Sequence, residues 1–242
     1  MKKFICAAPR QDVYPLNYTV KRNAIVVDTE TETNVPKFYE PIDCEHLRYE
    51  EPCGFPIIPV IHAYTEPGDE IEVLVLTADQ LDSDSTDPYS NVGTHINVEL
   101  LRYDVATICK KKGIKATVKK IMIPVDERVS VQLDTFERLT KELHEGDAVY
   151  ADISYGAKTG MYAILLALAY AHKALNNCHV ECIVYGEALF KQGAVVKKNL
   201  YDETKLFLLD QIMTSMTLQN IENPAALLRS LLHFDADEEE TV

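Results

Sequence analysis

Short runs of β-branched residues alternate along this chain with stretches whose apolar residues recur every three or four positions. The first pattern is typical of buried strands and the second of amphipathic helices. The alternation predicts an α/β fold, with a parallel sheet flanked by helices on both faces. The expected strands are residues 2–8, 71–78, 115–125, 147–154 and 178–186, and the expected helices are 98–113, 133–146 and 159–175.

Two regions depart from this alternation. Between the first two strands, residues 12–70 show no helical period, and the segments AIVVDTETE (24–32) and FPIIPVIHAYTE (55–66) predict a β-hairpin insertion. After the last strand, residues 204–233 predict two helices interrupted by the Asn-Pro pair at 223–224, because the residue before a proline disfavours helical backbone. The expected organisation is a core domain, a helical extension that offers a dimer or partner surface, and an acidic tail, over residues 1–200, 201–234 and 235–242.

Composition agrees with a soluble domain of this kind. Of the 242 residues, 47% are hydrophobic, which is enough for a large core. The longest apolar run, AILLALAYA (163–171), is too short to span a bilayer and predicts a buried helix. The few apolar residues between Met1 and Arg10 do not form a signal peptide, so we expect the protein in the cytoplasm.

The six cysteines are scattered and form no CxxC pair. In a chain without an export signal, we expect them to be reduced thiols rather than disulfides. The spacing of Cys44, His46 and Cys53 matches no common zinc motif, so we expect neither a metal site nor a cofactor. His62 and His172 lie in apolar surroundings and are expected to pack rather than to catalyse.

The net charge narrows the class of partner. The chain carries 24 basic and 38 acidic side chains, a formal charge of −14. Such a field disfavours binding to long DNA or RNA, which depends on neutralising many phosphates. A small anionic ligand in a local pocket is still compatible with it, and part of the acidic excess lies in the expected tail at 235–242.

In open parallel sheets, ligands bind beyond the carboxyl ends of the strands, where the following helices supply free N–H groups and a positive pole. The most suggestive connection of this kind is DISYGAKTG (152–160). It is not a Walker loop, because that motif requires glycine directly before the lysine and Ala157 precedes Lys158. We therefore do not expect a nucleoside triphosphatase.

Two interpretations of this turn stay open from the residues alone. In one, Gly156 permits a close backbone approach and Lys158 offers a positive charge to an anion. Ser154 and Thr159 then donate hydrogen bonds to the same ligand. In the other, Asp152, Ser154 or Thr159 merely caps the helix, and Lys158 is solvated.

Two further connections are predicted to follow strands at the same edge. Residues 7–14, AAPRQDVY, come after the first strand. There Arg10 can hold a phosphate through its planar donors and Gln11 can read a base edge or a hydroxyl, or Arg10 is an ordinary surface residue. Residues 77–91 begin with Thr77, and their aspartates repel phosphate, so this loop contacts a sugar or base, or no ligand.

Other catalytic motifs are absent from the sequence. Ser154 lacks the G-x-S-x-G setting of a hydrolase nucleophile, because residue 152 is aspartate. The histidines form no HExxH pair, and the loop after the first strand has no G-x-G-x-x-G. A nucleotide-dependent dehydrogenase is therefore disfavoured.

The strand, the turn and the apolar helix together resemble the second conserved motif of CARF domains, the CRISPR-associated Rossmann-fold sensors. That motif is roughly Asp or Asn, any residue, Ser or Thr, then glycine and a nearby Lys or Arg, and Asp152, Ser154, Gly156 and Lys158 match it in order. The resemblance covers about 95–232 and the first strand, including a helical extension after residue 200. It implies a Rossmann-like fold, and it does not extend to residues 12–70.

CARF domains bind cyclic oligoadenylates, the second messengers of type III CRISPR immunity, and typically dimerise with one ring across the two-fold axis. The resemblance therefore implies a cyclic oligoadenylate ligand and a homodimer in which two Lys158 residues face one ring. Many members carry a fused effector domain. Only some 10 residues follow the last expected helix, and there is no R-x-x-x-x-H ribonuclease motif.

Two functions follow from the resemblance. In the first, the protein is a ring nuclease: a ribose 2′-hydroxyl attacks the neighbouring phosphate without a metal, Lys158 stabilises the developing charge and Ser154 donates a hydrogen bond. In the second, it is a sensor that binds the ring and signals through a separate effector protein. The expected ligand-binding residues are Ala8, Pro9, Arg10, Gln11, Thr77, Asp152, Tyr155, Gly156, Ala157 and Thr159.

Overall fold

The computed structural model describes residues 1–9, 13, 17–21, 24–28, 36–78, 91–123, 126–192 and 194–218. The chain divides into two compact units, residues 1–202 and residues 203–242. Helix α5 (Thr204–Leu218) belongs to the second unit and confirms the first of the two helices expected after the core. The second helix, the acidic tail and most of the loop over 77–91 lie outside the described residues.

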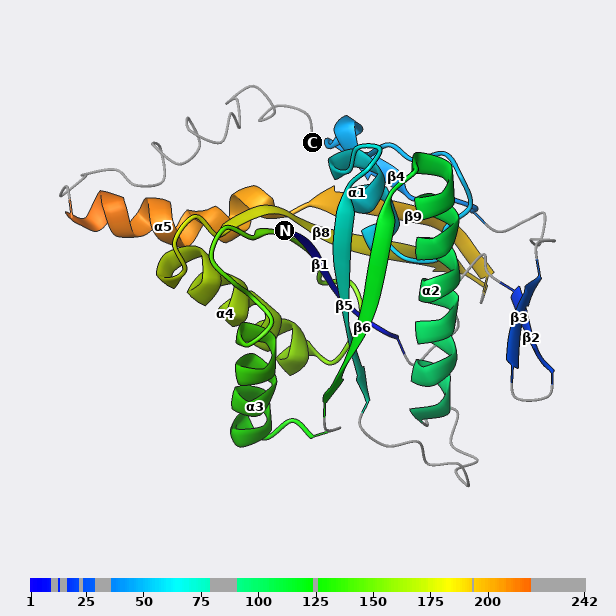
Figure 1. The fold of residues 1–242 in the computed structure, drawn as a ribbon, viewed down its shortest axis with the longest axis horizontal. Coiled ribbons are helices and arrows are strands. Elements are labelled where there is room, and N and C mark those ends of the chain that lie inside the picture. Colours follow the sequence, from blue (N-terminus) through cyan, green and yellow to red (C-terminus); the bar gives the residue numbers. More distant parts are fainter. Residues whose placement is uncertain are drawn as a thin grey trace. The chain divides into compact units, whose positions relative to one another are not determined.

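Among the described residues of the first unit, seven strands form one sheet in the order β4-β9-β8-β7-β1-β5-β6 (Figure 1). The five strands from β6 to β8 in this order are parallel, whereas β9 runs antiparallel to β8 and β4 pairs in parallel with β9. The α/β prediction is therefore confirmed. The strand bounds are β1 (Lys2–Ala7), β4 (Glu40–Ile42), β5 (Glu70–Ala78), β6 (Lys115–Ile123), β7 (Ala148–Asp152), β8 (His179–Lys191) and β9 (Ala194–Asp202).

Helices cover both faces of the sheet. Helices α1 (Ile57–Tyr64) and α2 (Asn91–Lys112) pack on one face, and α3 (Val129–Thr140) and α4 (Lys158–Ala174) pack on the other (Figure 1). Five consecutive residues of β1 are accordingly buried, since side chains on both of its faces meet a helical layer. Such continuous burial is characteristic of a central parallel strand.

The strand order places a topological switch point between β1 and β7. From β1 the chain continues to β5 and β6 on one side of the sheet, and later to β7 and β8 on the other side. The connections that leave the two neighbouring strands therefore diverge at their carboxyl ends. This is where open α/β sheets bind ligands.

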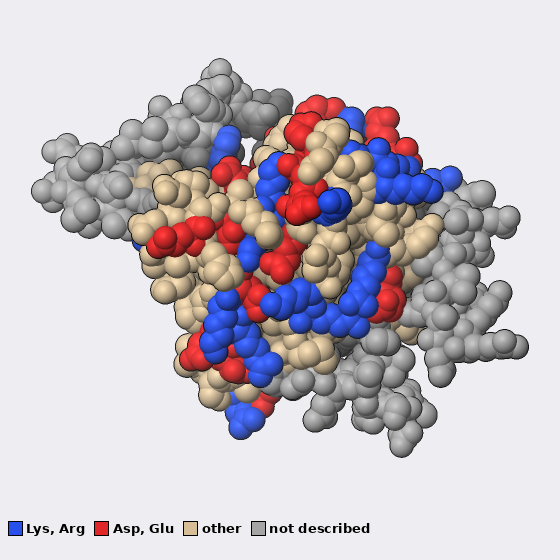
Figure 2. All heavy atoms as spheres, in the orientation of Figure 1, with Lys and Arg blue, Asp and Glu red and all other residues tan. Residues whose placement is uncertain are grey.

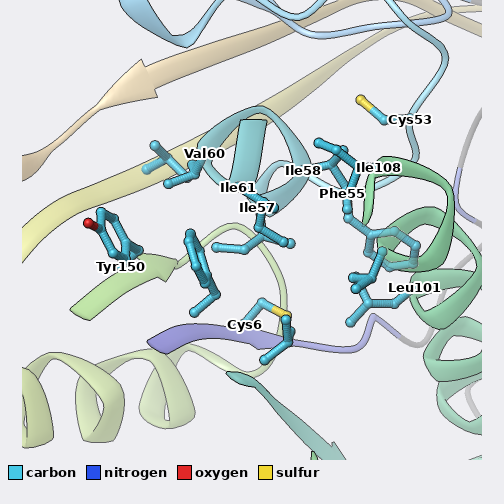
Figure 3. Packing of buried hydrophobic residues seen from close by; sticks show 14 of the residues in the cluster. Cys6, Cys53, Phe55, Ile57, Ile58, Val60, Ile61, Leu101, Ile108 and Tyr150 are labelled. Atoms are coloured by element: carbon cyan, nitrogen blue, oxygen red, sulfur yellow. The ribbon is translucent and has the colours of Figure 1, made fainter. Parts of the chain in front are cut away.

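The prediction of β structure at residues 55–66 is wrong, because residues 57–64 form helix α1. A short apolar run does not by itself distinguish a strand from a buried helix. Pro56 is the N-cap and Pro59 lies in the first turn, where N–H groups have no acceptor within the helix, so neither proline removes a helical hydrogen bond. Figure 3 shows isoleucines of this helix packed near Cys6 of β1 and Tyr150 of β7.

Outside residues 55–66, the expected insertion contains three strands and a short 3-10 helix among its described residues. Strand β3 (Ala24–Asp28) confirms the β structure expected from residue 24, and it pairs antiparallel with β2 (Asn17–Lys21), which was not predicted. Strand β4 and the short 3-10 helix η1 (Glu45–Leu47) follow. Leu47 and Phe55 are at most 1% exposed and belong to the main core, so this part of the chain is an integral part of the domain.

Several element boundaries differ from the prediction. Helix α2 begins at Asn91, before the expected start at 98, and α3 covers Val129–Thr140 rather than 133–146. Strand β8 continues beyond Gly186 to Lys191 and pairs with β9, which was not predicted. The alternation of apolar and polar residues does not reveal β9, because Lys198 in the middle of this strand is buried, whereas a lysine is normally exposed.

Helix α4 is buried on one side only, which corrects the expectation of a buried helix. Its inner side chains lie on the sheet, but Tyr162, Leu166 and Tyr170 are exposed to 69%, 50% and 46%. These three recur every four residues and form one apolar stripe. Within the described part of the chain, no helix combines the length and the apolar character needed to cross a membrane.

Gly186 lies where β8 faces the segment before α1. A Cβ atom at this position would come within 2.4 Å of Pro56 Cγ and 3.1 Å of Ser154 Oγ. We predict that Gly186→Ala destabilises the protein by about 1–3 kcal/mol, the usual cost of overpacking, in urea unfolding experiments.

Gly160→Ala is the matched control. A Cβ atom at Gly160, in the first turn of α4, meets no atom within 4 Å, so alanine there should be neutral or stabilise by up to about 1 kcal/mol. Equal stability of Gly186→Ala and wild type would show that β8 does not pack against Pro56 as described.

Candidate functional site

The turn after β7 is tied together by the hydroxyl of Ser154. This hydroxyl donates to Asp152 Oδ1, which also accepts the backbone N–H of Ser154 at 2.8 Å. The hydroxyl oxygen of Ser154 in turn accepts the backbone N–H of Gly186 in β8 at 2.6 Å. One side chain thus connects the end of β7 to the neighbouring strand.

This geometry changes the role expected for Ser154. A serine hydroxyl has a single proton, and here that proton is directed at Asp152. A hydrogen bond donated to a ligand would have to break this contact. Ser154 is thus placed to shape the turn, and the expected donor role does not fit this arrangement.

Asp152 is a buried carboxyl group, only 1% exposed. Burial raises its pKa from 3.8 to about 6, and the two hydrogen bonds from Ser154 oppose that shift. Its second oxygen, Oδ2, has no hydrogen-bond partner among the described residues. Asp152 therefore lies beneath the turn and supports it.

Gly156 brings the turn against β1. Its φ of +110° is a conformation that L-residues with side chains rarely adopt. A Cβ atom there would lie 3.3 Å from the Cβ of Ala7 at the end of β1. Gly156 therefore adopts the positive φ that glycine permits and lies against the end of β1.

Helix α4 begins directly after this turn without a side-chain cap. Ala157 is the N-cap, and this residue forms no side-chain cap hydrogen bond. The hydroxyl of Thr159 donates to Glu127 instead, so it does not cap the helix. Uncapped N–H groups and the helix dipole make this end of α4 a positive pole.

The exposed residues of the turn are Gly156, Ala157 and Lys158. Within the described part of the chain, no hydrogen bond or ion pair engages the Lys158 ammonium group. The turn therefore presents backbone donors and a positive charge to solvent. Of the second interpretation, capping of the helix by Asp152, Ser154 or Thr159 is wrong, whereas a solvated Lys158 agrees with its exposure.

The side chain of Tyr155 points into the protein, away from this exposed surface. Its hydroxyl lies 3.0 Å from the hydroxyl of Tyr39 and 3.4 Å from the carbonyl oxygen of Gly54. Its ring meets Phe55 edge to face, with the centroids 6.4 Å apart. Burial raises the pKa of Tyr155, so the phenol is neutral at physiological pH.

The loop after β1 is held close to the same edge. Ala8 and Pro9 are buried, and the N–H of Ala8 donates to the carbonyl of Leu76 at 2.9 Å. Asn97 of α2 donates from its side-chain amide to the carbonyl of Pro9 at 2.7 Å. Asn97 was not predicted, and the only signal for it in the sequence is a polar residue at a buried helical position.

The remaining predicted residues divide into two groups. Thr77, near the end of β5, is 5% exposed and presents little surface to a ligand. Arg10 and Gln11 lie outside the described residues. The structure thus brings Ala8, Pro9 and the 152–159 turn together at the switch point.

The β8–β9 hairpin rises beside this turn. β7 ends opposite Val184, so at about 3.3 Å per residue the segment from Val184 to Lys191 extends about 23 Å past that level. Leu189, Phe190 and Val196 near its tip are exposed to 38%, 61% and 51%. The sequence did not predict this hairpin.

Charge on the surface is mixed. On the face shown in Figure 2, Lys and Arg side chains lie beside Asp and Glu side chains. Ion pairs such as Lys120–Glu99, at 3.3 Å, account for part of this pattern. The described residues include no group of three or more His, Cys, Asp and Glu side chains arranged to hold a metal ion.

One cavity of about 510 Å³ lies away from the turn. It is lined by residues of the last turns of α2, including Lys111 and Lys112, and by Arg48 and His62. Lys111 pairs with Glu51 at 2.6 Å, so part of its charge is already neutralised. The chemistry of the switch point, rather than this cavity, defines the candidate site.

Comparison with models of known protein families and with curated proteins finds no match to this chain.

The raised pKa of Asp152 predicts a specific pH dependence of stability. The native state holds this proton more tightly than the unfolded chain, so the free energy of unfolding falls as pH rises from about 4 to about 6. The loss amounts to at most about 3 kcal/mol. Asp152→Asn keeps an oxygen for Ser154 but does not titrate.

Urea unfolding of wild type and Asp152→Asn at several pH values between 4 and 7 checks this prediction. The stability of the variant relative to wild type should rise across that interval, because the other titrating groups cancel in the difference. A difference that stays constant with pH would show that Asp152 titrates normally.

Proposed function

We propose that this protein binds a cyclic oligoadenylate at the switch point between β1 and β7 and cleaves it without a metal ion, as a ring nuclease of type III CRISPR immunity. One observation carries the proposal: an exposed lysine and a helix N-terminus without a side-chain cap lie together at the switch point of the sheet, the place where α/β sheets bind ligands. The residues that form this turn match the CARF motif in order.

The ligand class follows from the chemistry of the turn. A ring of phosphodiesters carries one negative charge per linkage, and the N–H groups at the start of α4 and Lys158 provide complementary donors. A small ring requires only this local positive pole. The net charge of −14 disfavours long nucleic acids as partners.

The proposed reaction is an internal phosphoryl transfer. A ribose 2′-hydroxyl attacks the adjacent phosphorus in line, the 5′-oxygen leaves and takes up a proton, and a 2′,3′-cyclic phosphate remains. The protein holds this geometry and stabilises the charge that develops on the phosphate oxygens. Lys158 and the N–H groups that follow Gly156 are the proposed stabilisers.

Ser154 has an indirect role in this proposal. Its hydroxyl holds the turn between Asp152 and Gly186, which fixes where the backbone donors point. Ala8 and Pro9 border the ligand through their backbone, and Arg10 and Gln11 are proposed to position it from the following loop.

We further propose that the protein acts as a homodimer in the cytoplasm. Lys158, Tyr162, Leu166 and Tyr170 follow one another at intervals of four on α4, and the three apolar members are exposed. A two-fold contact along this stripe would bring two Lys158 residues to one ring, as a symmetric ligand requires.

A second candidate function is a sensor that binds the ring without cleaving it. Leu206 and Met213 on α5 are exposed to 62% and 49% and offer an apolar surface to a separate effector protein. The binding site would be the same. Product analysis separates the two functions.

Lys158→Ala tests the proposed site. We predict at least about a hundredfold slower cleavage of cyclic tetra- or hexa-adenylate, because one stabiliser of the developing charge is lost. Chromatography and mass spectrometry follow the conversion of the ring to linear products with 2′,3′-cyclic phosphate ends, in the presence of a chelator.

Lys110→Ala is the control, since it changes the net charge equally in the last turn of α2. It should cleave like wild type. Tight binding without linear product would favour the sensor, and absence of binding to either ring by wild type would refute the ligand assignment. Undiminished cleavage by Lys158→Ala would remove that lysine from the mechanism.

Leu166→Glu tests the proposed dimer. A carboxylate in the centre of the apolar stripe should convert the dimer into a monomer and weaken ring binding at least about tenfold, because burying an unpaired charge is unfavourable. Analytical ultracentrifugation and filter binding measure the two effects. Val196→Glu, which alters a side chain of similar exposure on the β8–β9 hairpin, should stay dimeric; a monomeric wild type would refute the dimer.

A further inference from the structure

A buried polar cluster lies beneath the turn. Its members, which we call the hub, are Tyr39, Asp104 and Lys198, gathered around the backbone of Cys53 and Gly54. The three side chains come from separate parts of the fold and are only 2%, 4% and 2% exposed. Charged residues are rarely buried this deeply unless they are paired.

The hub holds the Cys53–Gly54 backbone at three atoms. Asp104 Oδ2 accepts the N–H of Gly54 at 2.8 Å, and the ammonium group of Lys198 donates to the carbonyl of Cys53 at 2.7 Å. The hydroxyl of Tyr39 lies 3.2 Å from the carbonyl of Gly54. This backbone segment is therefore held by side chains of α2, of β9 and of the residue directly before β4.

Tyr155 connects the hub to the turn. The hydroxyls of Tyr39 and Tyr155 and the carbonyl oxygen of Gly54 form a triangle with sides of 3.0, 3.2 and 3.4 Å. Two protons serve the three oxygens: one hydroxyl donates to the other, and the second donates to Gly54. Every donor is satisfied, so the position of the Tyr155 hydroxyl is well defined.

Lys198 contacts the ring of Tyr39. Its ammonium nitrogen lies 3.9 Å from the centroid of the Tyr39 ring, within the range of a cation–π interaction. Burial lowers the pKa of Lys198 to about 8, and the nearby Asp104 carboxylate opposes that shift. The ammonium group of Lys198 therefore faces a carbonyl oxygen and an aromatic ring.

We infer that Tyr39 is a positioning residue for the turn, that it acts through Tyr155, and that Lys198 keeps Tyr39 in place. Tyr155 directly precedes Gly156, whose backbone has the greatest conformational freedom in the turn. Ser154 anchors the turn to β8, and Tyr155 anchors it to the hub. With both anchors in place, the N–H groups at the start of α4 keep one orientation.

This inference rests on the proposed function only in so far as those N–H groups meet the phosphates of a ligand. It adds residues that are remote from the exposed surface and that do not touch the ligand. Loss of either tyrosine hydroxyl should loosen the turn and leave the packing of the rings intact.

Amide hydrogen exchange of the full chain tests the inference without a ligand. The amides of Ile153 and Ser154 are hydrogen-bonded in the native turn, to the carbonyl of Val184 and to Asp152. In Tyr155→Phe and Tyr39→Phe their exchange should accelerate about tenfold, the effect of one lost hydrogen bond. Tyr64→Phe, which removes hydroxyl contacts to His46 and Cys182 but none to the turn, is the matched control and should leave these amides unchanged.

Equilibrium binding of cyclic tetra- and hexa-adenylate tests the consequence for the site. We expect about tenfold weaker binding for each of the two variants. The double variant should be no weaker than either single one, because both hydroxyls act through one network. Tyr64→Phe should bind like wild type, even where it lowers the midpoint of thermal unfolding to a similar extent.

Unchanged exchange at Ile153 and Ser154 in Tyr155→Phe would overturn the inference whether or not the ligand is correct. Faster exchange with unchanged affinity would overturn the link to binding. If wild type binds neither ring, the proposed function fails, and the exchange experiment still decides whether the hub positions the turn.

Discussion

The hydroxyl of Ser154 is the contact on which the candidate site depends. It donates to Asp152 and accepts from the N–H of Gly186, so a single oxygen joins the end of β7 to β8 at the carboxyl edge of the sheet. This contact fixes where the chain leaves β7. After this contact, Gly156 packs against the end of β1, and α4 begins without a side-chain cap at Ala157.

The central sheet could be predicted from the sequence because its strands are buried on both faces. Short apolar runs that alternate with amphipathic helical stretches, such as the one in β5, indicate the buried strands of a parallel sheet. Residues 57–64 were predicted as β structure because this short apolar run shows no helical period, and both prolines of α1 lie where a helix tolerates them. Strand β9 was missed because Lys198 is buried through contacts that only the tertiary structure provides.

The candidate site shows the same division. Gly156 and Lys158 could be located from sequence, since a glycine and a lysine before a helix point to backbone approach and positive charge. The direction in which a side chain of the turn points could not be predicted from the sequence. Ser154 and Tyr155 both looked like ligand contacts, yet one is bonded to Asp152 and the other to Tyr39, and these partners are set by strand order rather than by local pattern.

The central claim is that the turns of two chains hold one cyclic oligoadenylate. Isothermal titration calorimetry of the full-length protein with cyclic tetra-adenylate and cyclic hexa-adenylate tests it most directly, because stoichiometry does not depend on whether cleavage follows slowly. The account predicts that one of the two rings binds with one molecule per two chains. Binding of one ring per chain, or no binding of either ring, would contradict it.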